Sequence, residues 1–152
     1  MDSKRLYAFA KESNEIEGIT KERRHLTHAA ALERFLALPS ITIDDLKFFV
    51  GSVEPTAKLR LTDGQRVFIG GREGLPGSLV FQNLTQLLNQ ISIATEGANR
   101  LHRWYEEIHP FTDGNGRSGR ALWLWLMVNR FGYDGRYKFL QMYYYLTFQE
   151  DA

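Results

Sequence analysis

Hydrophobic residues recur at helical spacing along most of this chain. One stretch, residues 117–131, is apolar on nearly every side, which is typical of a central helix packed against several neighbours. Thr20 and Thr42 are the expected N-terminal caps of the second and third helices. The pattern predicts an all-α helical bundle, with helices over residues 3–12, 20–38, 42–51, 84–97, 101–108, 117–131 and 136–148.

The segment from Val53 to Ser78 breaks this helical pattern. It holds Pro55, Pro76 and five glycines around two short extended pieces, KLRL (58–61) and RVFIG (66–70). The residues Thr62-Asp63-Gly64 between the two pieces are a hairpin signal. We therefore expect one exposed β-hairpin over residues 58–70 in an otherwise helical protein.

Composition limits the classes of function. A chain of 152 residues that is 43% hydrophobic can bury one core, so we expect one domain over residues 1–152. The formal charge is +1 with both signs interspersed, which argues against a nucleic-acid partner. There is no cysteine, which excludes disulfides, thiolate metal sites and a cysteine nucleophile. The N-terminus lacks the apolar core of a signal peptide, and the longest apolar run (121–128) is too short to cross a membrane. We therefore expect a cytoplasmic protein with no membrane partner.

Polar functional residues are densest in HPFTDGNGRSGR, residues 109–120. Pro110 disfavours helical geometry at His109, so the preceding helix should end there and leave the imidazole at the mouth of a loop. Gly114 and Gly116 permit backbone angles that other residues resist. Successive N–H groups can then converge on an anion at the start of the next helix.

The charges around this loop favour a phosphate ligand. Arg117 and Arg120 lie in the first turns of a helix, where the helix dipole repels a cation by about 0.3–1 kcal/mol. A multiply charged phosphate would offset both. Asp113 supplies the oxygen ligand through which Mg²⁺ usually accompanies a nucleotide. His109 has an intrinsic pKa suited to accepting a proton near neutral pH, so the loop combines a base with a phosphate site.

These twelve residues resemble the signature of Fic-domain proteins, H-x-F-x-[DE]-G-N-G-R-x-x-R, and match every fixed position. The resemblance implies a Fic-type helical bundle with a small β-hairpin flap. It also implies transfer of AMP from ATP to a Ser, Thr or Tyr hydroxyl of a target protein, with Mg²⁺. Residues 109–120 would then be the catalytic loop.

The resemblance assigns a role to each polar position of the loop. His109 would deprotonate the attacking hydroxyl, and Asp113 would hold Mg²⁺ between the α- and β-phosphates. The remaining residues would bind phosphate: the Gly114 and Gly116 amides with Asn115 would hold phosphate oxygens, and Arg117 and Arg120 the β- and γ-phosphates.

A second resemblance concerns SNEIEG, residues 13–18, within an N-terminal segment over residues 1–19. It is similar to the inhibitory motif [ST]-x-x-x-E-[GN] of many Fic-domain proteins, with Ser13, Glu17 and Gly18 at the fixed positions. The resemblance implies that Glu17 pairs with Arg120. A carboxylate there would take the place of the γ-phosphate. No separate antitoxin subunit would then be required.

The region over residues 53–78 resembles the flap with which Fic domains align the backbone of a target as an added strand. Lys58, Leu59 and Arg60 are the candidate target contacts. The resemblance further implies a protein target with a modifiable hydroxyl, modification of the protein itself, and self-association into a homo-oligomer.

Other functions stay open from the sequence. A Fic-like kinase would transfer the γ-phosphate, but such proteins resemble H-x-F-x-D-A-N-K-R, and Gly116 stands where they have lysine. Removal of AMP from a modified target, with Glu17 positioning water, is a second alternative. A non-catalytic nucleotide-binding module is a third, against which His109 and Asp113 argue. A metal site at His25 and His28, which share a helix face, is not expected because a third ligand is lacking.

Overall fold

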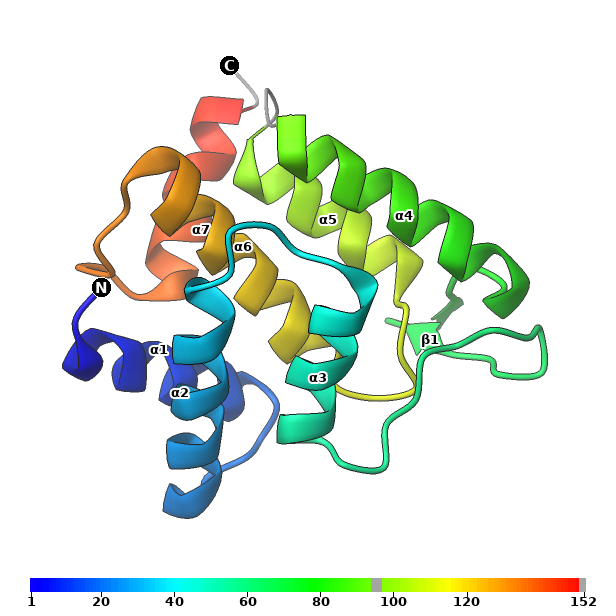
Figure 1. Cartoon of the computed structure of the whole chain (residues 1–152), viewed down its shortest axis with the longest axis horizontal. Coiled ribbons are helices and arrows are strands. Elements are labelled where there is room, and N and C mark those ends of the chain that lie inside the picture. The colour runs from blue at the N-terminus through cyan, green and yellow to red at the C-terminus, as the bar shows by residue number, and fades with distance from the viewer. Residues whose placement is uncertain (94–96, 151–152) are drawn as a thin grey trace.

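Helices make up most of the protein, as the hydrophobic spacing predicts. The computed structural model describes residues 1–93 and 97–150, so residues 94–96 of the predicted 84–97 helix lie outside the described part. The described residues form seven helices and one two-stranded sheet (Figure 1). In chain order they are α1 (Ser3–Ile16), α2 (Glu22–Leu36), α3 (Ile43–Val53), β1 (Phe68–Ile69), β2 (Arg72–Glu73), α4 (Gly77–Ile93), α5 (Ala98–Ile108), α6 (Asn115–Phe131) and α7 (Phe139–Glu150). The expected all-α class is confirmed.

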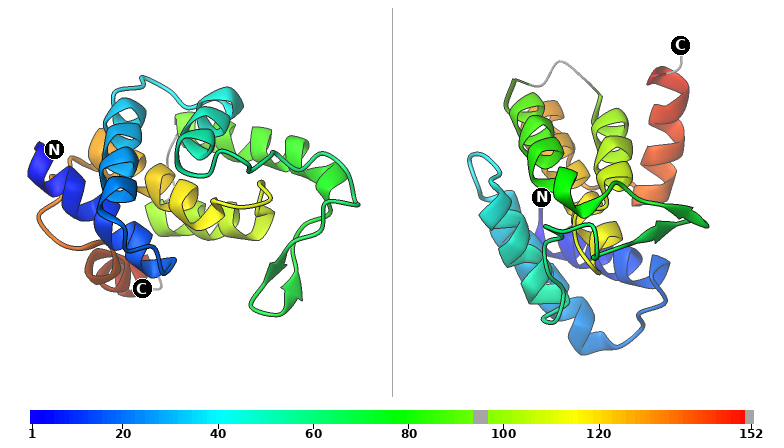
Figure 2. Two further views of the ribbon diagram at one scale, coloured as in Figure 1. Left: turned by 90° about the horizontal axis from the view of Figure 1, so that it is seen from below. Right: turned by 90° about the vertical axis from the view of Figure 1, so that its right-hand side faces the viewer.

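Helix α6 lies in the middle of the bundle, with α1, α2, α3 and α5 packed against it (Figure 1 and Figure 2). Its side chains from Ala121 to Leu126 are at most 2% exposed. Both indole N–H groups of this stretch have acceptors: Trp123 donates to Asn99 Oδ1 at 2.7 Å and Trp125 to the Leu38 carbonyl at 2.9 Å. Apolar burial with satisfied donors fixes α6 in place, so its first turn is a rigid platform. None of the described helices is long and apolar enough to span a membrane.

Helix α1 continues to Ile16, beyond the predicted end at residue 12. It ends in a Schellman motif, in which the N–H groups of Gly18 and Ile19 donate to carbonyls of the last turn at 2.9 Å each. Gly18 has a φ of +74°, in the left-handed region that glycine adopts without strain. This ending fixes Glu17 as the C-cap residue of α1.

The next two helices start differently. Helix α3 begins with the predicted cap, because Thr42 and Asp45 form a capping box with hydrogen bonds of 3.2 and 2.9 Å. The predicted cap at Thr20 is wrong: α2 begins one residue after Lys21, which makes no side-chain cap bond. The connection between α1 and α2 lies near the start of α6, because Gly18, Ile19, Thr20 and Lys21 line a pocket together with Arg117.

The hairpin lies further along the 53–78 region than predicted. Gly70 and Gly71 form its turn, with φ of +54° and +84°, and a two-residue turn with both φ positive matches the twist of a hairpin. Figure 2 shows this hairpin extending away from the helices. The predicted hairpin over residues 58–70, with its turn at 62–64, is wrong. The paired residues are Phe68 with Glu73 and Ile69 with Arg72.

The two pieces that suggested the wrong hairpin have other partners. Leu59 forms an antiparallel bridge with Phe111, in the loop after α5. Asp63, expected in the turn, instead accepts a hydrogen bond at 3.1 Å from the N–H of Ser78 in the first turn of α4. The extended piece 58–61 thus pairs with a segment distant in sequence. Asp63 makes no hairpin turn and instead accepts a hydrogen bond from the first turn of α4.

Candidate active site

His109 ends α5 and begins the loop that leads to α6. Its backbone is left-handed, with φ 47° and ψ 63°, and it is the one non-glycine residue with positive φ in the described part of the chain. This geometry costs a non-glycine residue on the order of 1–2 kcal/mol, so other contacts must hold it. The expectation that Pro110 ends the helix at His109 agrees with this geometry.

Arg60 supplies the contacts that hold this turn. Its side chain is buried, at 1% exposure, at the C-terminal end of α5, where the helix dipole favours a cation. Its hydrogen bonds connect the end of α5 to residues 65 and 75 of the 53–78 region. The expected role of Arg60 as a target contact is wrong, because a buried guanidinium cannot meet a partner protein. The guanidinium donates to the carbonyls of His109 (2.7 Å), Ile108 (2.8 Å), Leu75 (2.7 Å) and Gln65 (3.1 Å).

The other two expected docking residues lie beside the catalytic loop. Lys58 is exposed and Leu59 is half-buried. The carbonyl of Lys58 accepts the N–H of Thr112, and its own N–H donates to Thr112 Oγ1, both at 2.9 Å. Target docking by Lys58 and Leu59 stays a prediction.

The imidazole of His109 is half-buried at the edge of the loop. Its Nδ1 atom is buried and has no hydrogen-bond partner among the described residues, which leaves Nε2 to meet a substrate. Burial lowers the pKa of His109; the Glu106 carboxylate acts in the opposite direction, and Arg60 adds to the lowering. The ring is therefore neutral near pH 7 and can accept a proton.

The start of α6 has the uncapped backbone geometry that the predicted anion site requires. Gly114 is its N-cap residue, with a φ of +79°, and no side chain caps the helix. The first N–H groups of a helix have no partner within it, so these amides are available to an anion. A hollow of about 140 Å³ lies over them, lined by Glu17, His109, Thr112, Asp113, Gly114, Asn115, Gly116 and Arg117. We call the free N–H groups at the start of α6 the nest. The structure thus brings the imidazole of His109, the nest and Glu17 to one cavity.

Asn115 has a different job from the one expected of its side chain. Its Oδ1 accepts the N–H of Phe111 and its Nδ2 donates to the carbonyl of the same residue, both at 2.8 Å. The amide is 4% exposed, and Phe111 is buried in the core at 1% exposure. The side chain of Asn115 therefore closes the loop, and only its backbone N–H is left for a phosphate.

Asp113 is suited to a metal that arrives with a nucleotide. Its side chain is 66% exposed and lies 3.9 Å from the Arg117 guanidinium. Within residues 1–93 and 97–150, no group of three His, Asp or Glu side chains could hold a metal ion. A magnesium ion at Asp113 would therefore draw its remaining ligands from phosphate and water.

Arg120 is paired with the end of α1. Its Nη2 lies 2.6 Å from Glu17 Oε1. The same Nη2 donates to the Ser13 carbonyl at 2.9 Å, and Nε donates to Ser13 Oγ at 2.7 Å. Arg120 is 7% exposed and Glu17 is 37% exposed. The expected ion pair is present within one chain, and Ser13 contributes both a side-chain and a backbone acceptor to it.

Glu17 also lies directly over the nest. A Cβ atom added to Gly116 would come within 2.1 Å of Glu17 Oε1. Glycine at position 116 therefore makes room for the carboxylate. Because Glu17 lies above the amides and pairs with Arg120, an anion at this place would have to displace it from both.

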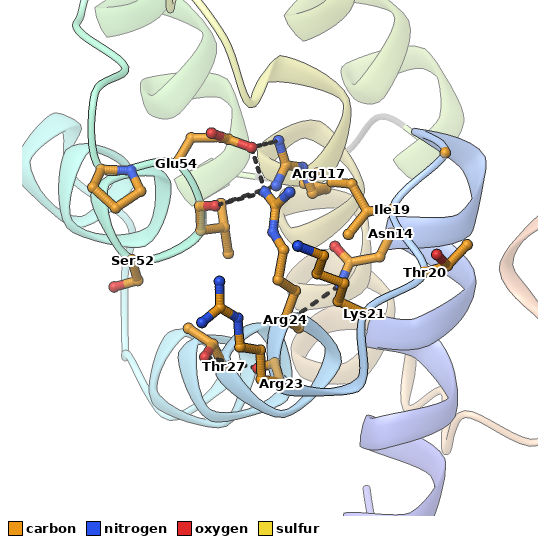
Figure 3. A pocket seen from close by; sticks show the side chains of 13 residues that line it. Asn14, Ile19, Thr20, Lys21, Arg23, Arg24, Thr27, Ser52, Glu54 and Arg117 are labelled. Atoms are coloured by element: carbon orange, nitrogen blue, oxygen red, sulfur yellow. Dashed lines mark hydrogen bonds and ion pairs between the residues drawn. The ribbon is translucent and has the colours of Figure 1, made fainter.

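Arg117 has a partner that the sequence did not reveal. Its Nη2 donates to Glu54 Oε1 at 2.8 Å, and Arg24 of α2 binds the same oxygen (Figure 3). Burial alone would raise the pKa of Glu54, but the hydrogen bonds from the two arginines hold it below its usual value. Arg117 is 4% exposed, so the first arginine of the loop is anchored by a carboxylate at the end of α3.

A buried histidine, His28, lies within electrostatic reach of Arg117 and Arg120. His28 is 1% exposed, and its Nδ1 lies 2.8 Å from Asn14 Oδ1. Burial lowers its pKa to about 3, with further lowering by the charges of Arg117 and Arg120. His28 and its neighbour His25, which lies 3.0 Å from Asn14 Nδ2, thus contact a core asparagine.

We predict that His28 makes the fold acid-sensitive. An unfolded chain protonates this imidazole near pH 6.5, whereas the folded protein holds it neutral down to about pH 3. The free energy of unfolding should therefore fall by about 1.4 kcal/mol per pH unit between these limits. Urea titrations at pH 7, 6, 5 and 4 would measure the slope. A His28→Gln variant should show a flatter slope, and equal slopes would contradict the prediction.

Comparison with known proteins identifies the segment that holds this site. Residues 75–127 match the Fic/DOC family, a range that runs from the start of α4 through most of α6 and contains His109, the nest and Arg120. No curated protein matches the chain significantly. The segment that contains the whole loop over residues 109–120 is thus similar to the Fic/DOC family.

Proposed function

We propose that this protein is an adenylyltransferase that transfers AMP from ATP to a hydroxyl side chain of a target protein, and that Glu17 restrains it. One observation carries the proposal: the imidazole of His109 and an uncapped helix N-terminus line the same hollow. A base and an anion site in one hollow suit attack by a hydroxyl on a bound phosphate.

The reaction needs little covalent help from the protein. The target hydroxyl oxygen forms a bond to the α-phosphorus, and its proton passes to Nε2 of His109. The bond between the α-phosphorus and the bridging oxygen breaks, and the electron pair leaves with pyrophosphate. The amides at the start of α6 stabilise the charge on the α-phosphate oxygens. Magnesium held by Asp113 would neutralise charge on the α- and β-phosphates when bound.

Position 116 distinguishes this loop from the kinase-type loop, which has lysine there. A side chain there would collide with Glu17, since even a Cβ atom would lie 2.1 Å from its carboxylate oxygen. A lysine, as in the kinase-type loop, would therefore require the Glu17 carboxylate to move from its present place. The inhibitory pair and the glycine nest form one consistent set.

Labelled ATP tests the proposal. Wild-type and Glu17→Gly proteins are incubated with Mg²⁺, a cell lysate and ATP labelled at either the α- or the γ-phosphate. We expect α-label in protein, on targets and on the chain itself. Protein label from the γ-phosphate alone would establish the kinase alternative. If neither label reaches protein with either the wild type or the Glu17→Gly variant, the result would favour a non-catalytic nucleotide-binding module.

A further inference from the structure

A second hollow adjoins the active site. It measures about 610 Å³ and lies between the α1–α2 connection, the first turns of α2, the end of α3 and Arg117 (Figure 3). Glu54 is the one carboxylate among its lining residues, so three positive charges are uncompensated. The lining cations are Lys21, Arg23, Arg24 and Arg117.

Two of the four cations that line this basic hollow have no ion-pair partner in the described part of the protein, whereas Arg24 and Arg117 share Glu54. Lys21 and Arg23 are exposed and make no ion pair among the described residues. Arg117 is 4% exposed, and its Nε atom is buried with no acceptor in the described part of the chain. Figure 3 shows the charged ends of Arg23 and Arg24 extending toward Glu54, with Lys21 beside Arg24. Such a surface attracts a multiply charged anion.

The basic hollow is connected to the active site through Arg117, which lines both cavities. The two hollows also meet at the end of α1, where Glu17 lines the active-site hollow and the next residue, Gly18, lines the basic hollow. His109 lines only the active-site hollow. In phosphoryl and nucleotidyl transfer the leaving group departs on the side opposite the attacking oxygen. Because Arg117 lines both hollows, an anion that leaves the nest on the side away from His109 would reach the basic hollow at Arg117.

We propose that the basic hollow binds pyrophosphate, the leaving group of the proposed reaction, after its bond to the α-phosphorus breaks. The ligand class is a diphosphate anion, and Lys21 and Arg23 are its recognition residues outside the nest. The leaving-group role rests on the proposed function. The binding of a diphosphate anion does not, because it requires no turnover.

Calorimetric titration with pyrophosphate tests the site in the full chain. The titration is done without ATP or Mg²⁺ at about 150 mM salt, where exposed charges more than about 8 Å apart are screened. Wild type, in which Glu17 covers the nest, is compared with Lys21→Gln/Arg23→Gln. The matched control, Lys11→Gln/Lys47→Gln, removes two exposed charges that do not line the hollow.

We expect about tenfold weaker pyrophosphate binding in the Lys21/Arg23 variant, or about threefold for each near-surface charge, and less than twofold loss in the control. All four replaced residues are exposed, so thermal unfolding should be unchanged and reports that the variants fold. Equal affinities of wild type and the Lys21/Arg23 variant, or equal losses in both double variants, would overturn the site.

A second measurement separates the leaving group from an unrelated diphosphate ligand. In the Glu17→Gly background, pyrophosphate should inhibit AMP transfer, and the Lys21/Arg23 changes should raise the inhibitory concentration about tenfold. Unchanged inhibition would overturn the leaving-group role. If the protein binds pyrophosphate but transfers no AMP, the proposed function is contradicted and the diphosphate site is retained.

Discussion

Replacement of Glu17 by glycine is expected to raise the rate of AMP transfer by about 10- to 100-fold. The range follows from the strength of a hydrogen bond between charged groups, about 1.5–3 kcal/mol, which ATP must otherwise displace. The contact to be removed is short, at 2.6 Å, and solvent reaches it mainly from the side of Glu17, which is 37% exposed, whereas Arg120 is 7% exposed. The carboxylate also leaves the space above Gly116.

Initial rates with α-labelled ATP would measure the effect. A Glu15→Gly variant is the matched control: it removes a carboxylate from the same helix end, where its one ion pair is an exposed contact of 3.9 Å with Lys11. Its rate should stay within about twofold of wild type, as expected for an exposed pair. The Glu17→Gln variant should fall between the two, because it keeps the bulk and loses the charge. Equal rates for the Glu17 and Glu15 variants would contradict autoinhibition through Glu17.

The parts of the site that the sequence predicted are local in the chain. Pro110 ends α5, and Gly114 supplies the positive φ that starts α6, so residue types alone indicate the loop geometry. The Glu17 pair is not local, but it was predicted from its resemblance to a motif. The physical basis of its position is the Schellman ending at Gly18, which holds the carboxylate at the end of α1.

The parts that the sequence did not predict depend on contacts between distant segments. Glu54 follows α3 as a single carboxylate without periodic or motif context, and only the packing of α3 on α6 brings it to Arg117. The local pattern predicts an exposed strand at Arg60, but its side chain is buried, and four carbonyls from three segments accept its hydrogen bonds. Local turn signals cannot reveal such convergence, and the Gly70-Gly71 turn competed with a plausible Asp63-Gly64 turn.

Replacement of His109 by alanine is expected to lower the rate of AMP transfer by about 10²- to 10⁴-fold, the usual contribution of a general base. The comparison is made in the Glu17→Gly background, where the rate is large enough to measure. Affinity for Mg²⁺ and ATP should change little, because the nest consists of backbone amides at the start of α6. The loss should therefore appear in kcat and not in KM.

The pH dependence gives an independent readout of the same residue. Because burial lowers the pKa of His109, its ring stays neutral below the ordinary value of 6.5, and the rate should hold until the pH falls through that lowered pKa. Protonation then removes the acceptor, so the acid limb has a midpoint below pH 6.5. His109→Ala should lose this limb together with its rate, while thermal unfolding reports that the variant is folded. A folded alanine variant with the wild-type rate and the same acid limb would exclude His109 as the base, and the anion site would then have to act on a hydroxyl deprotonated by another group.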